Sequence, residues 1–274
     1  MRIRLHWLTL AAFLLCGCGR PAPTIETFVD VQQSGVALRF PSSTFAGYAV
    51  QQEPKLTAQE IGTDIPIGVA PARIVITFSD KRSLPALEKG PRYFLPSRSY
   101  ISFVPLEDKT VADFAKSYPQ VADTAKQLDA VLKDRPNLSD VFKPVPDLSA
   151  IDEGQSLRCK VRYIALPRLS GIAYVTQYSQ EDQGNPANNE ELAYVFQGVL
   201  KTQDSGRMYI DARFAITHFS LPKGIDDANR ITRDKSNQYL RNAEKTLESH
   251  PDQSFQPSLS VLRDVLATIS TTAK

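Results

Sequence analysis

Four alternating runs between residues 157 and 216 constrain the fold more than any other feature of this sequence. Apolar side chains occupy every second position in the runs 157–164, 172–179, 192–197 and 208–216. A period of two is typical of strands that turn one face toward a core. Turn-forming residues separate the runs at 169–171, 183–189 and 204–206. The pattern predicts an antiparallel meander with one buried face, in a register that a one-residue slip would destroy.

Shorter strands precede this meander. Residues 36–40 alternate and stop at Pro41, and residues 45–50 follow them, which predicts a first hairpin. Residues 73–78 and 100–104 predict two further strands.

Helical patterns accompany the strands. Thr110 is expected to cap a helix with an apolar stripe, and Pro119 after it either starts a second helix or kinks one long helix. Residues 225–248 predict a polar helix that lies on the surface. Pro257 fits the first turn of a last helix, which is expected to pack across the sheet. This order of elements predicts the α+β class, an antiparallel sheet with helices packed on it.

The start of the chain has the layout of a secretory signal peptide. A short basic start precedes an apolar run at 5–15, which is too short to span a bilayer of roughly 30 Å as a helix. The residues Leu15-Cys16-Gly17-Cys18 resemble the lipobox of bacterial lipoproteins, with a branched apolar residue three positions before the cysteine and a small residue immediately before it. By that resemblance residues 1–17 are removed as a lipoprotein signal peptide. Cys18 then carries a diacylglyceryl thioether and usually an acyl chain, such as palmitate, on its amine.

The lipobox implies where the protein is held. Two or more acyl chains give stable membrane attachment, whereas one gives only marginal attachment. Residues 18–34 begin with two prolines and are expected to be a tether, although their end can still pair with the fold. Residues 35–274 are expected to form a single α+β domain. The protein is thus expected in the cell envelope, on the extracytoplasmic side of either the inner or the outer membrane, and an ordinary secreted protein is the alternative.

The order of elements also resembles that of known proteins. The resemblance lies in residues 35–40, in residues 175–198 and in the final segment 255–262. In outline these stretches are similar to uncharacterised bacterial lipoproteins and to the PsbP and Mog1 type of α/β/α sandwich. Proteins of the latter fold are often accessory or assembly factors. The resemblance therefore implies a binding role and no particular catalytic motif.

Charge and residue counts exclude several classes of function. The chain has 32 basic and 30 acidic residues, and the leader contains Arg2, Arg4 and no acid, so the remainder is electrically neutral. A neutral chain argues against general nucleic-acid binding, which needs a basic surface. Cys159 is the only cysteine left after Cys16 is removed and Cys18 modified, so no intramolecular disulfide is expected.

Two residues are the nearest approach to catalytic candidates. Cys159 lies in the apolar phase of its strand, where buried packing is a better interpretation than a thiolate nucleophile. His218 ends a strand and could serve as a base only with a partner that the sequence does not reveal. His218 and His250 are the only histidines after the leader, which argues against a histidine-rich zinc site.

Three polar stretches are candidates for binding. Residues 181–191 supply many oxygen ligands but lack the fixed spacing of a calcium loop, so a polar hairpin loop is favoured. Residues 80–98 hold a local basic excess that either contacts anionic lipid or an acidic partner or is a solvated loop. The polar sheet face could bind an anionic ligand, but solvent or a covering helix is favoured there. That face comprises Arg158, Lys160, Arg162, Asp211 and Arg213.

Three functions remain open. The first is a membrane-tethered, non-catalytic interaction or assembly module that contacts the membrane through Cys18 and has an envelope protein as its partner. The second is a lipid-anchored carrier of a small or apolar ligand, marked by a pocket lined with sheet aromatics. The third is a hydrolase that uses His218 or the acidic loop. The sequence supports no catalytic, cofactor-binding or metal-ligating assignment.

Overall fold

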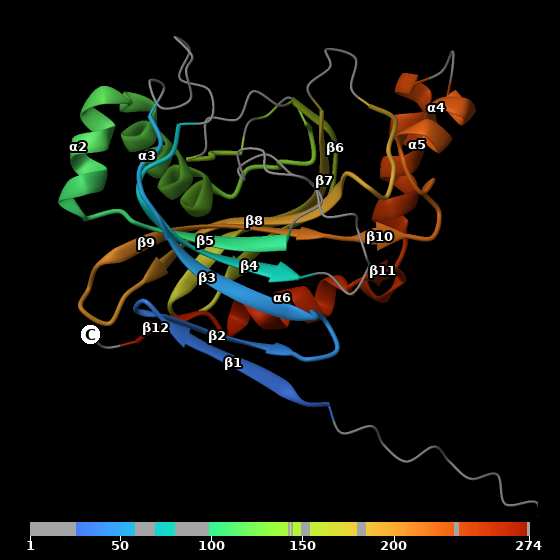
Figure 1. The fold of residues 1–274 in the computed structure, drawn as a ribbon. Coiled ribbons are helices and arrows are strands. Elements are labelled where there is room, and N and C mark those ends of the chain that lie inside the picture. The colour runs from blue at the N-terminus through green and yellow to red at the C-terminus, as the bar shows by residue number, and fades with distance from the viewer. Residues whose placement is uncertain are drawn as a thin grey trace, which may run out of the picture.

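The computed structural model describes residues 26–57, 69–79, 99–141, 143, 145–148, 154–179, 185–232 and 236–272. Its main element is a seven-stranded antiparallel sheet with the strand order β3-β4-β5-β9-β8-β7-β6 (Figure 1). The strands are β3 (Gly47–Glu53), β4 (Arg73–Ser79), β5 (Ser99–Pro105), β6 (Gly154–Ala165), β7 (Leu169–Ser179), β8 (Leu192–Lys201) and β9 (Arg207–Ala215). The predicted meander of the last four strands is confirmed.

Two helices cover one face of this sheet, α2 (Lys109–Ser117) and α3 (Pro119–Asp134). Asp108 caps α2, because its carboxylate accepts the Thr110 N–H at 2.7 Å, so the expected cap at Thr110 is wrong by two positions. Pro119 starts α3 and does not kink one long helix, since the first helical position needs no N–H donor. Arg135 ends α3 in the left-handed region, with φ of 48°.

A smaller sheet and two helices cover the other face (Figure 1). The small sheet has the order β1-β2-β12, and the helices α5 and α6 pack beside it against the same core. Its strands are β1 (Phe28–Gln33), β2 (Val36–Pro41) and β12 (Ser270–Thr271); the helices are α5 (Ser236–Ser249) and α6 (Leu259–Ala267). The remaining elements are β10 (Thr217–His218), α4 (Ile225–Thr232), a 3₁₀ turn (Asp252–Ser254) and β11 (Phe255–Gln256). The apolar stripe of α6 is buried as predicted.

The predicted first hairpin is wrong. Strand β2 pairs with β1 through a two-residue turn at Ser34 and Gly35, whose φ angles are 57° and 84°. Two successive positive φ values match the twist of a tight hairpin, and Gly35 adopts them without strain. Strand β3 pairs instead with β4 in the main sheet. Because β1 lies within residues 18–34, the paired part of the chain already begins at Phe28, before the predicted domain boundary.

The prediction of one buried face is also wrong, because both faces of the meander are covered. Ile172 and Tyr174 of β7 pack with α2 and α3, whereas Tyr194 and Phe196 of β8 belong to the core beneath α6. The alternating pattern predicts all four side chains on the same face of the sheet. Both phases of β7 are apolar, as in sheets that are covered on both faces, so its period alone could not assign a side.

A bulge in β6 adds to the change of face. The pairing of β6 with β7 shifts between Cys159 and Arg162, and Lys160 there has a φ of 56°. The extra residue sends Cys159 into the core beneath α6 and Val161 into the core beneath α3.

The α+β class, with helices packed on an antiparallel sheet, is confirmed. In the described part of the chain, none of the helices has the length and apolar character needed to cross a membrane. The predicted signal peptide, Cys18 and the basic segment 80–98 lie outside the described residues.

Candidate functional site

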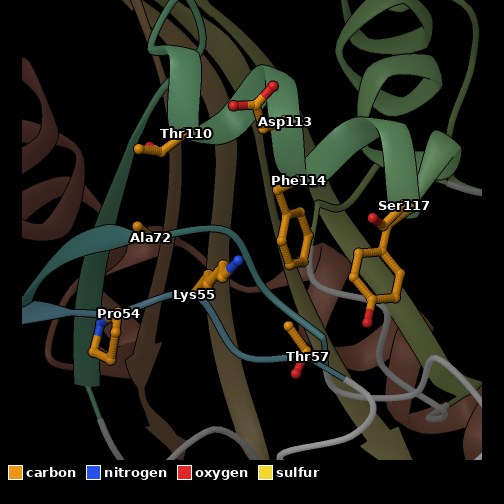
Figure 2. Close-up of a pocket in the computed structure, with 9 residues that line it drawn as sticks. Pro54, Lys55, Thr57, Ala72, Thr110, Asp113, Phe114 and Ser117 are labelled. Carbon is orange, nitrogen blue, oxygen red and sulfur yellow. The ribbon is translucent and has the colours of Figure 1, made fainter.

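An open groove of about 540 Å³ lies between α2 and the chain that links β3 to β4. Figure 2 shows Phe114 extending from α2 toward Lys55 and Thr57 on the opposite wall. We call this feature the α2 groove; it is lined by Pro54, Lys55, Thr57, Ala72, Thr110, Asp113, Phe114, Ser117 and Tyr118. Its volume lies within the range of roughly 300–1,000 Å³ that is usual for small-molecule sites.

The floor and rim of the α2 groove differ in chemistry. Phe114 is buried and packs against Tyr118 with ring centroids 4.5 Å apart and ring planes tilted by 33°, so the two rings form an aromatic floor. Asp113 is exposed at the rim and pairs with Lys116 at 2.6 Å, and Lys55 is exposed on the facing wall. The groove therefore offers an apolar floor between polar walls, as binding sites do.

The predicted polar sheet face is not a solvent-exposed surface. Arg158, Asp211 and Arg213 are buried under the crossover that joins α3 to β6, and Lys160 is buried under the end of α5. Only Arg162 remains exposed, 3.9 Å from Asp252. The sequence favoured solvent or a covering helix for this face. A loop covers Arg158, Asp211 and Arg213 instead, and the end of a helix covers only Lys160.

Arg158 holds the crossover onto the sheet. Its guanidinium donates to the carbonyl oxygens of Leu138 (3.0 Å), Asp140 (3.1 Å) and Lys143 (2.7 Å), and its Nε donates to Gln155 Oε1 (2.6 Å). Burial lowers the pKa of Arg158. The side chain thus satisfies loop carbonyls that would otherwise be left without donors.

Lys160 plays a similar part on the other face. Its Nζ donates to the carbonyl oxygens of Glu248 (2.7 Å) and His250 (2.6 Å) at the end of α5. Its backbone N–H donates to Glu248 Oε2 at 2.5 Å, which binds the bulge to the helix. A cation at a helix C-terminus is favourable because the carbonyl groups there carry partial negative charge.

Arg213 and Asp211 lie in a buried charged cluster beside Asp147. Arg213 donates to Asp147 Oδ2 at 3.2 Å and lies over the Tyr178 ring at 4.6 Å, and Tyr100 donates to Asp211 Oδ2 at 2.7 Å. Burial by itself would lower the pKa of Arg213, but the surrounding tyrosines and carboxylates raise it above its usual value. Arg213 is therefore a permanent cation in the interior.

His218 is held as a neutral ring. Its Nδ1 lies 2.7 Å from Ser220 Oγ and its Nε2 lies 3.0 Å from Ser254 Oγ, and Ser254 in turn donates to the Pro251 carbonyl. Burial, followed by the charges of His250 and Lys160, lowers its pKa to about 4. Both ring nitrogens are occupied by hydroxyl groups, and the ring orients the turn that joins β10 to α4.

The other candidates also have structural settings. Cys159 is buried, and burial raises the pKa of its thiol, so it packs as an apolar residue as predicted. In the described part of the acidic loop, Asn188 Oδ1 accepts the N–H groups of Glu190 and Glu191. Glu191 accepts from the side chains of Asn188 and Asn185, so its carboxylate is used within the turn. Residues 181–184 lie outside the described part.

No cluster of three potential His, Cys, Asp or Glu metal ligands occurs among the described residues. A scan against protein-family models finds no match for this chain. The curated proteins contain no match either.

Two features of this face of the sheet were not predicted from the patterns in the sequence. The aromatic floor of the α2 groove was identified only as the apolar stripe of a helix, because its opposite wall comes from residues 54–57. The half-buried amide of Gln155 and the buried amide of Gln197 were not predicted. A glutamine in the middle of an apolar strand such as β8 is the signal that could have identified Gln197, since a buried amide requires partners.

Proposed function

We propose that this protein is a lipoprotein tethered through Cys18 to the extracytoplasmic face of a membrane, where it acts as a non-catalytic interaction or assembly module. The proposal rests first on the lipobox at residues 15–18. About ten residues separate Cys18 from Phe28, and an extended chain of that length reaches about 35 Å. A lipid on Cys18 would therefore keep β1 close to the membrane surface.

The α2 groove is the observation that favours binding. It combines the buried Phe114 and the half-buried Tyr118 with exposed polar groups on a helix that is packed on the sheet. A site on a rigid element holds its shape before the partner arrives, which lowers the entropic cost of binding.

A carrier of a small or apolar ligand is the second candidate. The volume of the α2 groove supports it, although the aromatic lining comes from α2 and not from the sheet. The sheet tyrosines Tyr174 and Tyr209 are instead fully buried. We also propose that the fold is of the PsbP and Mog1 type. Proteins of that type often have accessory roles, which agrees with the interaction or assembly module and not specifically with a carrier.

The anchor is tested by labelling with a fatty-acid analogue and fractionating membranes. Cys18→Ser should abolish labelling and release the protein from the membrane fraction. Cys16→Ser is the matched control, because residue 16 leaves with the leader, and it should label normally. A membrane-bound, labelled Cys18→Ser protein would refute the anchor.

The groove is tested by recovering partners from envelope extract. Ser117→Arg places a bulky charge at the exposed rim without touching the core, whereas Gln127→Arg makes the same kind of change on the exposed side of α3. Partner recovery should fall with Ser117→Arg alone. Equal recovery from both variants would contradict binding in the groove, and native mass spectrometry that finds a small molecule bound to the protein would favour the carrier.

A further inference from the structure

Polar side chains on the face of the sheet that α2, α3 and the crossover cover follow the order of the strands. Five neighbouring strands contribute to one row of hydrogen-bonding side chains, which we call the cross-strand polar chain. It comprises Arg158 and Gln155 of β6, Tyr174 of β7, Gln197 of β8, Asp211 of β9 and Tyr100 of β5. The row therefore runs across the sheet from its β6 edge to β5.

The direction of each hydrogen bond is fixed from the β6 end. An arginine can only donate, so the oxygen of the Gln155 amide must face Arg158. The Gln155 amide nitrogen then donates to the Tyr174 hydroxyl at 3.2 Å. Tyr174 donates to Gln197 Oε1 at 3.0 Å, which is its shorter contact, since the Tyr178 hydroxyl lies 3.4 Å away. Because the Gln197 amide oxygen accepts from Tyr174, the Gln197 amide nitrogen is the next donor in the cross-strand polar chain.

From the β5 end, the chain reaches Asp211. Tyr100 donates to Asp211 Oδ2, which leaves Asp211 Oδ1 as the next acceptor. Gln197 and Asp211 are directly opposite in the pairing of β8 with β9. A donor and an acceptor thus approach each other from opposite ends of the same row.

The chain is interrupted at this point. Within the described part of the chain, Gln197 Nε2, Asp211 Oδ1 and Arg213 Nε have no hydrogen-bond partner. The exposed fractions of these residues are 0%, 1% and 7%, and Arg213 Nε lies 3.8 Å from the other oxygen of Asp211. A buried polar group without a partner destabilises a fold, so three together on facing strands require an explanation.

We propose that these three groups bind one internal water molecule, which closes the cross-strand polar chain. The unpaired groups are two donors, on Gln197 and Arg213, and one acceptor on Asp211. A water molecule accepts two hydrogen bonds and donates to the carboxylate, which satisfies all three groups with the usual number of partners for a buried water. Arg213 would repel a cation and Asp211 would repel an anion, so a neutral occupant is required.

The first test needs no variant. A high-resolution crystal structure of the protein should show one water oxygen within hydrogen-bond distance of Gln197 Nε2, Asp211 Oδ1 and Arg213 Nε. Oxygen-17 relaxation of the protein in solution should show a matching long-lived water. A direct contact between Gln197 and Asp211 with no water between them, or density for a larger molecule, would overturn the proposal.

The second test exchanges the donor and the acceptor. Gln197→Glu and Asp211→Asn, each made alone, give the water the wrong set of partners. Together they restore it, with the acceptor at position 197 and the donor at position 211. The effects of the two single variants on the unfolding equilibrium constant, multiplied together, predict a value for the double variant. The measured constant should be at least about tenfold smaller than that value, which means a more stable fold.

The control for this cycle pairs Asp211→Asn with Gln52→Glu on the exposed edge strand β3. These two changes are expected to be additive, because their positions share no partner. If Gln197→Glu and Asp211→Asn were equally additive, the two side chains would not share a bound molecule and the closed chain would be refuted.

Discussion

Replacing Arg158 with methionine should detach the crossover between α3 and β6 from the sheet. Methionine keeps an apolar stem of similar length but donates no hydrogen bond. The carbonyl of Leu138 lies in buried surroundings, and leaving it without a donor destabilises the fold by about 2 kcal/mol. The carbonyls of Asp140, Val141 and Lys143 lie nearer to solvent, where water can replace the lost donor, so each contributes no more than about 0.5 kcal/mol.

The expected loss in the free energy of unfolding is therefore about 3 kcal/mol. For a chain of this size, such a loss corresponds to a decrease in Tm of roughly 6–12 °C. Urea unfolding followed by far-ultraviolet circular dichroism measures the loss. Hydrogen exchange then shows where it arises, and amides in residues 138–148 should exchange faster while those of β7 and β8 change less.

Two comparisons make this prediction refutable. Arg168→Met changes an exposed arginine and should alter stability by less than about 0.5 kcal/mol. Arg158→Lys should recover only part of the loss, because one ammonium cannot reach the same fork of carbonyl groups. If Arg158→Met were no more destabilising than Arg168→Met, or if faster exchange were spread evenly over the sheet, Arg158 would not anchor the crossover.

Three further predictions follow from the packing and the titratable groups. Gly198→Ala should destabilise the fold by about 2 kcal/mol in urea unfolding, because an added Cβ would lie 2.5 Å from the ring of Phe196; Gly47→Ala, whose Cβ would meet nothing closer than 3.9 Å, should be nearly neutral. The pKa of His218 is about 4 in the folded protein and about 6.5 in the unfolded chain. The contribution of His218 to the free energy of unfolding is therefore fully present above about pH 6.5, and it declines as the pH falls toward 4. His218→Gln should remove that part of the decline, on the order of 1 kcal/mol, and an unchanged pH profile would contradict it. The thiol of Cys159 should resist alkylation at pH 8 in the folded protein and react readily in denaturant, since burial raises its pKa; rapid labelling of the folded protein would refute its burial.

Local elements of this fold were predictable because their signals are local. The period-two runs identified β6 to β9, and a slip in their register would expose apolar side chains. Pro119 marked the boundary between α2 and α3, because it lacks the N–H that an interior helical residue must donate. The apolar spacing of residues 259–266 identified the last helix. The sequence thus determined the α+β class, and its residues 15–18 resemble a lipobox.

Only the tertiary structure decided which strands meet and what the polar side chains do. In the pairing of β5 with β9, Tyr100 lies opposite Arg213, although more than a hundred residues separate them in the sequence. A periodic pattern within one segment cannot predict such a pairing. The bulge at Lys160 shifts the alternation in β6, so side chains after it lie on the opposite face from the one predicted. The crossover and the end of α5 bury polar side chains for which the sequence specified no cover. An alternating pattern of apolar and polar residues shows which side chains share a face of a strand. It does not show which loop or helix covers that face. The burial of Arg158 and Gln197 depends on loops and helices that pack there only when the whole chain is folded.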